Sequence, residues 1–351
     1  MSRLVALAPV LPPHRHSQHE ITRTVAPLLC PDGARAELVR RLHGATGVGS
    51  RYLAMPLEKY AHLDSFTRSN ALFVELATDL LERAARSALT EASMTPEEVD
   101  LVVLTTVTGV AVPSVDVLVA RRLGLRQDVT RVPTMGWGCA GGVAGTALVH
   151  DHLVGHPGAV ALLLSVELCS LTLQHGDDST PNLVASGLFG DGAAAALLVG
   201  EEHPAAGGPQ VVGGASHLVA GTESDLGWQV GSSGLRIVLS AGLPDTIALH
   251  LHHEVTRFLK GHDLAVEDVA GWVVHAGGPR VLEAVTDALG LPPQALVRSW
   301  QSLAEVGNMS SASVLHILRA TLDAPVRGPL VMVAFGPGVA IELVLLRTEV
   351  G

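Results

Sequence analysis

The stretch Met135-Gly136-Trp137-Gly138-Cys139-Ala140-Gly141-Gly142 leads into a helical pattern over residues 143–154. This arrangement places the Cys139 thiol at the N-terminus of a helix, where unpaired N–H groups and the helix dipole favour negative charge. Such a setting lowers the pKa of a cysteine and makes a thiolate nucleophile available near neutral pH. A small buried cysteine among packing glycines fits this segment equally well.

Apolar runs alternate with helical patterns along the whole chain. A first run covers residues 4–11. Further runs that read as buried strands cover residues 99–106, 159–166 and 193–199, and later residues 269–275, 329–335 and 339–346. This alternation is typical of an α/β fold with largely parallel sheets.

The two parts of the chain repeat one plan. When the second part of the sequence is aligned with the first, one and the same shift places His275 opposite Thr106 and Asn308 opposite Cys139. We therefore expect a duplicated fold with an N-terminal half over residues 1–205 and a C-terminal half over residues 206–351. A stretch rich in Pro, Gly and Ala near residues 201–210 is the expected linker. Parallel α/β sheets bind ligands beyond the carboxyl ends of their strands, so the site is expected where the two halves meet.

Composition narrows the class of protein. The chain has 351 residues, of which 48% are hydrophobic, and a net charge of −11. This length suits one large domain or two intimate halves. The acidic balance argues against general nucleic-acid binding, which needs a basic surface. No apolar run reaches the roughly 20 residues that a membrane-spanning helix needs.

Cysteine and histidine usage points to a reducing compartment and to no metal. The three cysteines, Cys30, Cys139 and Cys169, form no CxxC pair. This predicts a cytoplasmic protein without disulfides or a structural zinc site. The histidines near the N-terminus and over residues 150–156 lack the spacing of metal ligands, so no metal is assigned.

Two further polar residues follow apolar runs of the second half. His275 ends the run Gly271-Trp272-Val273-Val274 and opens Ala276-Gly277-Gly278-Pro279, and Asn308 follows Gly307. Either residue alone is weak evidence, because such residues often cap backbone groups. Together with Cys139 they form a candidate catalytic set, since the duplication places Asn308 opposite the cysteine.

Several motifs together resemble one family. They are Gly138-Cys139-Ala140-Gly141-Gly142, Leu188-Phe189-Gly190-Asp191-Gly192-Ala193-Ala194, His275-Ala276-Gly277-Gly278-Pro279, Gly307-Asn308-Met309-Ser310-Ser311-Ala312 and Phe335-Gly336-Pro337-Gly338. Their order and spacing resemble those of type III polyketide synthases, the chalcone-synthase-like family, and especially its bacterial members. The resemblance extends from about residue 51 to residue 346. It implies a thiolase-like five-layer αβαβα fold, a homodimer and no cofactor besides the CoA thioester substrates.

The resemblance implies roles for the candidate set. Cys139 takes the starter acyl group and holds the growing chain as a thioester. His275 pairs with the thiolate and, with Asn308, holds the thioester carbonyl of malonyl-CoA. Decarboxylation then gives an enolate whose oxygen needs these donors, and one such donor contributes about 3–4 kcal/mol.

The same register assigns residues to a cavity and to a CoA tunnel. Phe189 matches the family's gatekeeper, and Val112 matches a position that crosses the dimer interface. The cavity positions are Cys169, Thr172, Trp228, Ile237 and Ser310, and the loop Phe335-Gly336-Pro337-Gly338 matches the cyclisation loop. Arg41 matches one CoA-binding position and Arg280 is a second candidate, whereas two lysine positions of the family hold Leu38 and Ala45. This departure leaves delivery by an acyl-carrier protein open.

The expected function is iterative decarboxylative Claisen condensation of malonyl-CoA onto an acyl-CoA starter, followed by cyclisation to a pyrone or a phenolic product. Ile237 and the low aromatic content favour a medium- or long-chain fatty acyl starter, and malonyl-CoA as its own starter is the alternative. A ketoacyl-carrier-protein synthase of the III type, with a single condensation, is the runner-up. A Cys–His thioester hydrolase and a non-catalytic acyl-binding relative represent other classes.

Overall fold

The computed structural model describes residues 1–205 and 207–348, and within them a nine-stranded sheet runs through the centre. Its strand order is β11-β12-β13-β8-β1-β7-β6-β4-β5. The strands are β1 Ser2–Val10, β4 Leu101–Thr105, β5 Thr130–Thr134, β6 Val160–Leu168, β7 Asp191–Gly200, β8 Gln210–Leu218, β11 Gly271–Val274, β12 Gly328–Gly336 and β13 Ala340–Thr348. Each apolar run that the sequence predicts as a strand lies in one of them.

The strand order contains the duplication. The sequence β4-β6-β7-β1 in the first part corresponds to β11-β12-β13-β8 in the second, with the same parallel and antiparallel pairings. The two parts join where Ser2 and Arg3 pair with Val211 and Gln210. The predicted boundary between residues 205 and 206 touches residue 206, which lies outside the described residues.

The expectation of largely parallel sheets is wrong. Only β4 with β5, β4 with β6 and β11 with β12 are parallel among the described strands, and the other pairs are antiparallel. The continuous apolar runs reflect burial of both sheet faces by helices, as the wholly buried β6 shows. Burial of both faces is common in parallel sheets but does not require them.

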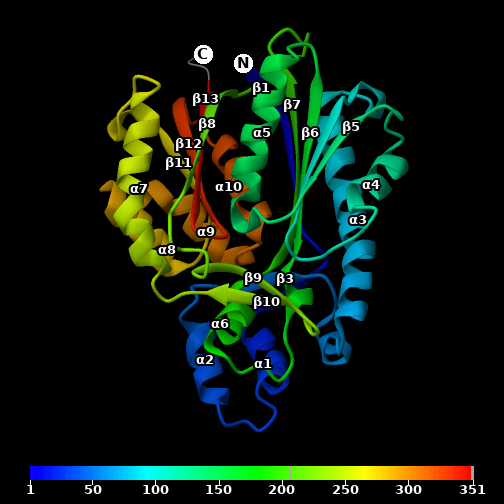
Figure 1. Ribbon diagram of the computed structural model, residues 1–351, viewed down its shortest axis with the longest axis vertical. Coiled ribbons are helices and arrows are strands. Elements are labelled where there is room, and N and C mark those ends of the chain that lie inside the picture. Colours follow the sequence, from blue (N-terminus) through cyan, green and yellow to red (C-terminus); the bar gives the residue numbers. More distant parts are fainter. Residues whose placement is uncertain (206, 349–351) are drawn as a thin grey trace.

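Helices cover both faces of each part of the sheet, which gives the five-layer thiolase-like αβαβα fold (Figure 1). The two central helices, α5 and α10, pack between the halves, α3 and α4 lie outside the N-terminal part, and α7 and α8 lie outside the C-terminal part. The bounds are α3 Phe66–Ala92, α4 Val115–Leu123, α5 Gly141–Gly155, α7 Leu243–Lys260, α8 Pro279–Leu289, α9 Val297–Val306 and α10 Ser313–Leu322. Across the described residues, none of the helices has the length and apolar content to cross a membrane.

Glycines allow the central layer to pack tightly. A Cβ at Gly142 of α5 would lie 2.5 Å from the Ser311 carbonyl oxygen, and one at Gly145 would lie 2.7 Å from Leu163. Both distances are shorter than real Cβ contacts, so only glycine lets α5 approach α10 and β6 this closely.

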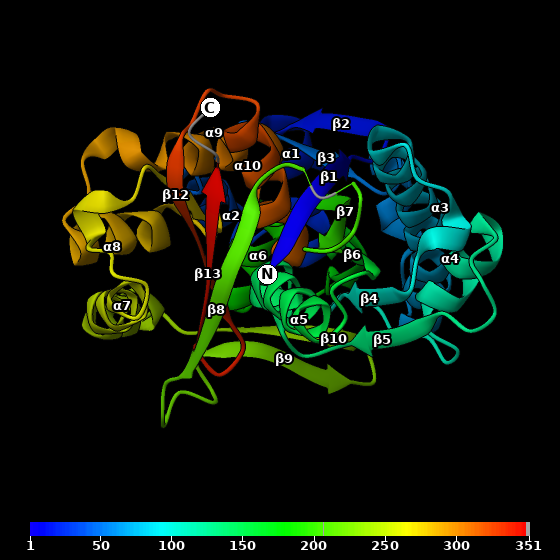
Figure 2. The same ribbon diagram turned by 90° about the horizontal axis from the view of Figure 1, so that it is seen from above.

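A further group of elements lies beyond one end of the sheet (Figures 1 and 2). It consists of β2 His14–Ser17, α1 Gln18–Leu29, α2 Ala36–Gly44, β3 Ser50–Leu53, α6 Thr180–Leu188, β9 Leu226–Gly231 and β10 Gly234–Leu239. Ser17 caps α1 through a capping box with Glu20. These elements come from both halves of the chain and enclose the candidate site described next.

Candidate active site

Cys139 lies in a short 3-10 turn, Gly138–Ala140, at the N-terminal end of α5. Gly138 before it adopts φ +48°, and a Cβ there would lie 2.7 Å from Pro337. Both observations require glycine at this position. The turn therefore presents the thiol against the loop Phe335-Gly336-Pro337-Gly338, which connects β12 to β13.

The expected low pKa of Cys139 is wrong for the protein without substrate. Burial raises the pKa of this thiol to about 12, and the neighbouring Ser310 and Asn308 side chains only partly oppose that rise. Loss of hydration thus outweighs the helix terminus. The thiol therefore needs a proton acceptor before it can act as a nucleophile.

Asn308 is the amide that contacts this thiol. It follows α9 and Gly307, whose φ of +73° turns the chain. The Asn308 Oδ1 accepts a hydrogen bond of 2.8 Å from the Ser310 backbone N–H. Its Nδ2 donates over 3.4 Å to the Gly277 carbonyl oxygen. The side-chain amide is thus held with its N–H groups facing the region between Cys139 and the turn after His275.

His275 directly follows β11, and its backbone N–H donates over 2.8 Å to the Val333 carbonyl oxygen. The side chain is buried, and neither ring nitrogen has a hydrogen-bond partner among the described residues. Burial lowers the pKa of this imidazole to about 4. At neutral pH the ring is therefore neutral, and it offers one N–H donor and one free acceptor.

Asn308 lies between the Cys139 turn and the turn that begins at His275. The amide contacts the Cys139 thiol on one side and the Gly277 carbonyl on the other, and Gly277 belongs to the turn that begins at His275. No hydrogen bond connects His275 with Cys139 within the described part of the chain. A thiol, a neutral imidazole and an amide donor suit acyl transfer and stabilisation of an enolate oxygen.

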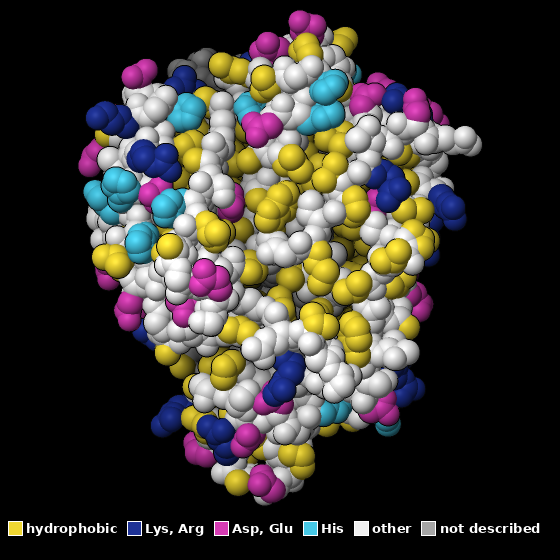
Figure 3. All heavy atoms as spheres, in the orientation of Figure 1, with side chains coloured by type: hydrophobic (Ala, Val, Ile, Leu, Met, Phe, Trp, Pro, Cys, Tyr) yellow, Lys and Arg dark blue, Asp and Glu magenta, His cyan; other side chains and the backbone are white. Residues whose placement is uncertain are grey.

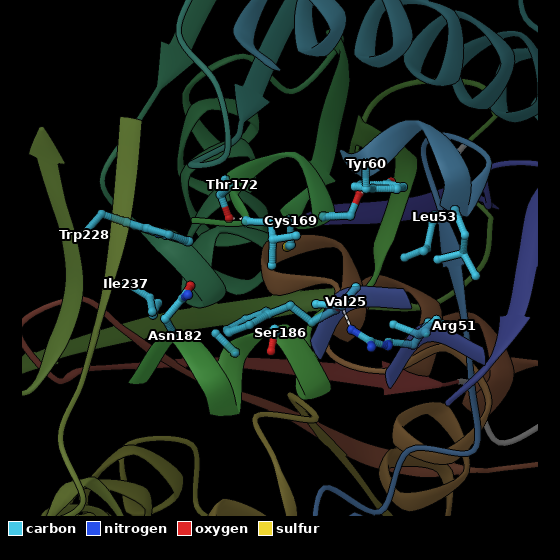
Figure 4. Close-up of a pocket in the computed structure, with 16 residues that line it drawn as sticks. Val25, Arg51, Leu53, Tyr60, Cys169, Thr172, Asn182, Ser186, Trp228 and Ile237 are labelled. Atoms are coloured by element: carbon cyan, nitrogen blue, oxygen red, sulfur yellow. Dashed lines mark hydrogen bonds between the residues drawn. The ribbon is translucent and has the colours of Figure 1, made fainter. Parts of the chain in front are cut away.

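A pocket lies next to this set. Predicted cavity residues that line it are Cys169, Thr172, Phe189, Trp228 and Ile237. Figure 4 shows Trp228 and Ile237 on one side, from β9 and β10, and Arg51, Leu53 and Tyr60 on the other. Ser310 does not line this cavity, since its side chain lies against Cys139.

Phe189 connects the cavity with the amide. It follows α6 and forms a parallel β-bridge with Asn308. Asn308 N–H donates to the Leu188 carbonyl oxygen over 3.0 Å, and Gly190 N–H donates to the Asn308 carbonyl oxygen over 2.9 Å. Backbone hydrogen bonds therefore join the segment of the predicted gatekeeper directly to that of the predicted oxyanion donor.

Sequence reasoning missed a buried carboxyl group beneath the site. Glu167 accepts hydrogen bonds from Val107 N–H, Thr108 Oγ1 and Ser311 Oγ, over 3.1, 2.9 and 2.6 Å. Burial raises the pKa of Glu167 to about 7, and these hydrogen bonds oppose the rise. A charged residue inside the apolar run of β6 was the available signal.

Sequence reasoning also missed Arg51 and Tyr60 of the cavity wall and the buried carboxyl group of Asp191 near them. Asp191 accepts hydrogen bonds from the Ala54 and Ser170 backbone N–H groups over 2.6 and 2.8 Å. Burial raises the pKa of Asp191 to about 6. The motif Phe189-Gly190-Asp191-Gly192 contained that carboxyl group, but nothing in the sequence places Arg51 beside it.

A second, larger cavity of about 1220 Å³ opens on the other side of Leu188. Gly277, Gly278 and Arg280 line it, and so does Ala45, at a position where the family has lysine. Arg280 donates over 3.3 Å to the Ala241 carbonyl oxygen. Arg41 is exposed on α2 outside this lining, and most of the other lining side chains are apolar.

Val112 lies far from the candidate set in its own chain. It is 96% exposed and lines a surface groove together with Val110, Phe73 and Met135. Figure 3 shows apolar side chains gathered over the middle of the face that carries α5, β9 and β5. The β5 strand also ends the sheet, so its outer backbone groups have no neighbouring strand among the described residues.

Comparison with known proteins gives consistent matches over the whole chain. The family description "Chalcone and stilbene synthases, N-terminal domain" fits residues 11–203, and "Chalcone and stilbene synthases, C-terminal domain" fits residues 210–350. The chain is 49% identical to a 1,3,6,8-tetrahydroxynaphthalene synthase of Streptomyces peucetius subsp. caesius, over 98% of this chain and 92% of the relative.

More distant relatives and solved structures agree. The chain is 32% identical to the α-pyrone synthesis polyketide synthase-like Pks18 of Mycobacterium tuberculosis, over 93% of this chain and 86% of that protein. The crystal structure of 1,3,6,8-tetrahydroxynaphthalene synthase from Streptomyces coelicolor A3(2) superposes with a TM-score of 0.93 at 28% identity. The superposition covers 99% of this chain and 100% of that one.

Proposed function

The chain belongs to the chalcone and stilbene synthase family, the type III polyketide synthases, and we propose that it builds a small aromatic polyketide from malonyl-CoA alone. Iterative condensation of malonyl-CoA is the general reaction of this family, so the protein is an acyltransferase. The observation that carries the proposed catalysis is the Asn308 amide, which contacts the Cys139 thiol and the turn after His275.

In the first proposed step, the Cys139 sulfur attacks the thioester carbonyl of the starter. The thiol proton passes to the free acceptor nitrogen of His275, which is neutral at neutral pH. The bond between the carbonyl carbon and the CoA sulfur breaks, and the CoA thiolate leaves and takes up that proton. The starter is then a thioester of Cys139.

In the second step, malonyl-CoA loses its carboxylate as carbon dioxide. The electron pair of the broken bond forms an enolate, whose oxygen receives hydrogen bonds from the His275 ring N–H and the Asn308 Nδ2–H. The enolate carbon attacks the Cys139 thioester, and the thiolate leaves. The extended chain then returns from CoA to Cys139 for the next cycle. A neutral imidazole suits this step because it keeps an N–H to donate.

Two observations support malonyl-CoA as the starter. The relative that is 49% identical is a 1,3,6,8-tetrahydroxynaphthalene synthase, and the ten carbons of a naphthalene skeleton correspond to five two-carbon units. The cavity is bounded by Trp228 and Tyr60, and it holds the buried side chain of Arg51, a poor neighbour for an alkyl chain. A fatty acyl starter remains the alternative, and the aliphatic Ile237 in the cavity wall favours it.

We propose that substrates enter through the larger cavity, with Arg280 near the CoA phosphates and Arg41 farther out on α2. A lining with so little positive charge suits a CoA thioester less well than the family's lysines do, and it leaves acyl-carrier-protein delivery as the second route. The free cysteines support a cytoplasmic location. The apolar groove around Val112 and the open edge of β5 support a homodimer.

The test is product analysis with purified protein. With carbon-labelled malonyl-CoA alone, we expect release of labelled carbon dioxide and a polyhydroxylated aromatic in the mass spectrum. A Cys139→Ala variant should give neither an acyl-enzyme nor product. A panel of fatty acyl-CoA starters added to malonyl-CoA should leave the main product unchanged.

Other outcomes would reject parts of this proposal. Product that forms only when a fatty acyl-CoA is present would show that the starter is a fatty acyl group and not malonyl. A product extended once and left on a carrier protein would indicate a ketoacyl-carrier-protein synthase. Thioester cleavage without carbon dioxide release would indicate a hydrolase.

A further inference from the structure

Arg51 places an incompletely paired guanidinium in the cavity wall. It lies in β3, and its side chain is 2% exposed. Its Nη1 donates over 2.5 Å to the Phe189 carbonyl oxygen. The Nε and Nη2 atoms have no hydrogen-bond partner among the described residues. In Figure 4 the side chain extends from β3 toward the middle of the lining residues.

The nearest carboxylate leaves this group unsatisfied. The two Asp191 oxygens accept hydrogen bonds from Ala54 and Ser170, and no ion pair connects Asp191 with Arg51 within the described residues. Burial lowers the pKa of Arg51 to about 10, while the Asp191 charge opposes this change. The guanidinium therefore stays charged at neutral pH. A buried cation with unused donors is costly unless a ligand supplies an anion.

The free donors have a defined shape. The N–H groups on Nε and Nη2 lie along one edge of the planar guanidinium and point in nearly the same direction. That edge matches the two oxygens of a carboxylate in a bidentate pair. A ketone or a hydroxyl group offers a single oxygen, so the edge favours a carboxylate over the carbonyl groups of a polyketide chain.

Two residues of the cavity wall lie close to the nucleophile. Phe189 lines the cavity and is bridged to Asn308, which contacts Cys139. Cys169 also lines the cavity, and the charge of a Cys139 thiolate raises its pKa, which requires the two sulfurs to be near each other. A chain that starts at Cys139 and passes Phe189 and Cys169 therefore extends toward Arg51.

We propose that Arg51 binds the carboxylate at the far end of a malonyl-primed chain and thereby selects a dicarboxylic starter. This inference rests on the proposed function, because a malonyl starter carries such a carboxylate and a fatty acyl starter does not. The ion pair also holds that carboxylate away from His275 and Asn308, whose N–H groups stabilise the enolate of decarboxylation. The starter keeps its carboxylate during extension, while each extender unit loses one. After the last condensation the starter carboxylate, which is then β to a ketone, leaves as carbon dioxide, and the electron pair of the broken bond takes up a proton.

The first test uses the unmodified protein and matched pairs of starters. Succinyl-CoA and butyryl-CoA differ only by a carboxylate in place of a methyl group, as do glutaryl-CoA and pentanoyl-CoA. With malonyl-CoA as extender, we expect kcat/KM for the dicarboxylic member of at least one pair to be about 10- to 100-fold higher, the range for a hydrogen bond to a charged group. Equal values, or a preference for the methyl member, in both pairs would overturn the proposal.

The second test replaces the guanidinium. Arg51→Met should remove the preference and leave the two members of each pair equal, and Arg51→Lys should keep part of it. Tyr60→Phe is the matched control, because it alters a neighbouring cavity group without a change of charge, and it should keep the preference. Circular dichroism checks that each variant folds. If Arg51→Met does not fold, the comparison of starter pairs with the unmodified protein decides the question.

The outcomes separate this inference from the proposed function. If Arg51→Met lowers kcat/KM for both members of each pair by the same factor, Arg51 only holds Phe189 in place and the inference is wrong. If the unmodified protein makes nothing from malonyl-CoA alone but still prefers dicarboxylic starters, the proposed starter is wrong and the assignment of Arg51 stands.

Discussion

Asn308 illustrates how much of the proposed chemistry depends on a single hydrogen-bond donor. Its Oδ1 is engaged by the Ser310 backbone N–H, so the Nδ2 group is oriented and not free to flip. We predict that Asn308→Ala slows decarboxylation of malonyl-CoA by about 100- to 1000-fold, the loss expected for one oxyanion donor. Release of labelled carbon dioxide measures this directly.

The exposed Gln301 on α9 provides the control for that prediction. Gln301→Ala should leave carbon dioxide release unchanged. Asn308→Asp, which keeps the shape of the side chain but loses the N–H donors, should be as slow as Asn308→Ala. If either Asn308 variant decarboxylates malonyl-CoA at the normal rate, Asn308 is not the oxyanion donor.

Glu167 gives a prediction about pH. Burial raises the pKa of this carboxyl from 4.5 to about 7 in the folded protein. Between these values the folded protein binds more protons than the unfolded chain, so its contribution to stability falls as pH rises. Glu167→Gln removes this effect. The stability of the variant relative to the unmodified protein should therefore improve by about 3 kcal/mol from about pH 5 to about pH 8.

Denaturant unfolding at several pH values measures this difference. Glu342→Gln is a suitable comparison, because burial also raises the pKa of Glu342 but that residue lies on β13, away from the candidate set. If Glu167→Gln and the unmodified protein show parallel stability curves over this pH range, Glu167 is ionised at no cost in the folded state.

At the residue scale, the sequence indicated which residues are candidates for the site better than it indicated the surroundings of their side chains. Cys139, His275 and Asn308 stand out because polar residues follow apolar strands at repeated positions. Their protonation could not be predicted in this way, since the pKa of Cys139 depends on burial by segments distant in the chain. Arg51 was missed for the same reason, because its hydrogen-bond partner Phe189 and the nearby Asp191 charge come from the other end of the N-terminal half.

At the scale of elements, the close packing of α5 makes a prediction about helix contacts. Gly142→Ala would place a methyl group 2.5 Å from the Ser311 carbonyl oxygen. We expect a loss of about 1–3 kcal/mol, typical of overpacking, and a loss of activity, because Ser311 bonds to Glu167 and follows Ser310. Thermal unfolding and product formation measure the two effects.

Gly155 at the exposed end of the same helix is the matched control. A Cβ there meets no atom within 4 Å, so Gly155→Ala should leave stability equal or slightly higher. Equal melting temperatures for both variants would mean that α5 shifts easily and that the central layer is not tightly packed.

Elements differ in how well the sequence predicts them. The strands β4, β6 and β7 were predictable because their side chains are buried along their whole length. The direction of β7 and β13 was not, since a fully buried strand has the same pattern in parallel and antiparallel pairs. The elements around α1, α2 and α6 also escaped prediction, because only their assembly from both halves buries them.

At the scale of the whole molecule, the groove around Val112 predicts assembly into a dimer. If this groove is the contact between two copies, Val112→Glu buries an unpaired carboxylate, which costs several kcal/mol. We expect the dissociation constant to rise on the order of a hundredfold or more, with a shift to monomer. Light scattering coupled to size exclusion measures the mass.

Leu249 on α7 is the control for this change, since it is 75% exposed on another face of the protein. Leu249→Glu should keep the dimeric mass. A Val112→Glu protein that stays dimeric would show that the copies meet elsewhere.

The β-bridge between Phe189 and Asn308 has a consequence for engineering this enzyme. Amino-acid changes that reshape the cavity at Phe189 will be epistatic with changes in the decarboxylation machinery, because one backbone segment carries both. A mutant library that varies the gatekeeper alone should thus recover many slow enzymes and few with altered products. Gly190 and Gly307, which flank the two bridged residues, cannot supply compensating changes, because a Cβ at either position would lie 2.4 Å or 2.8 Å from a backbone carbonyl oxygen.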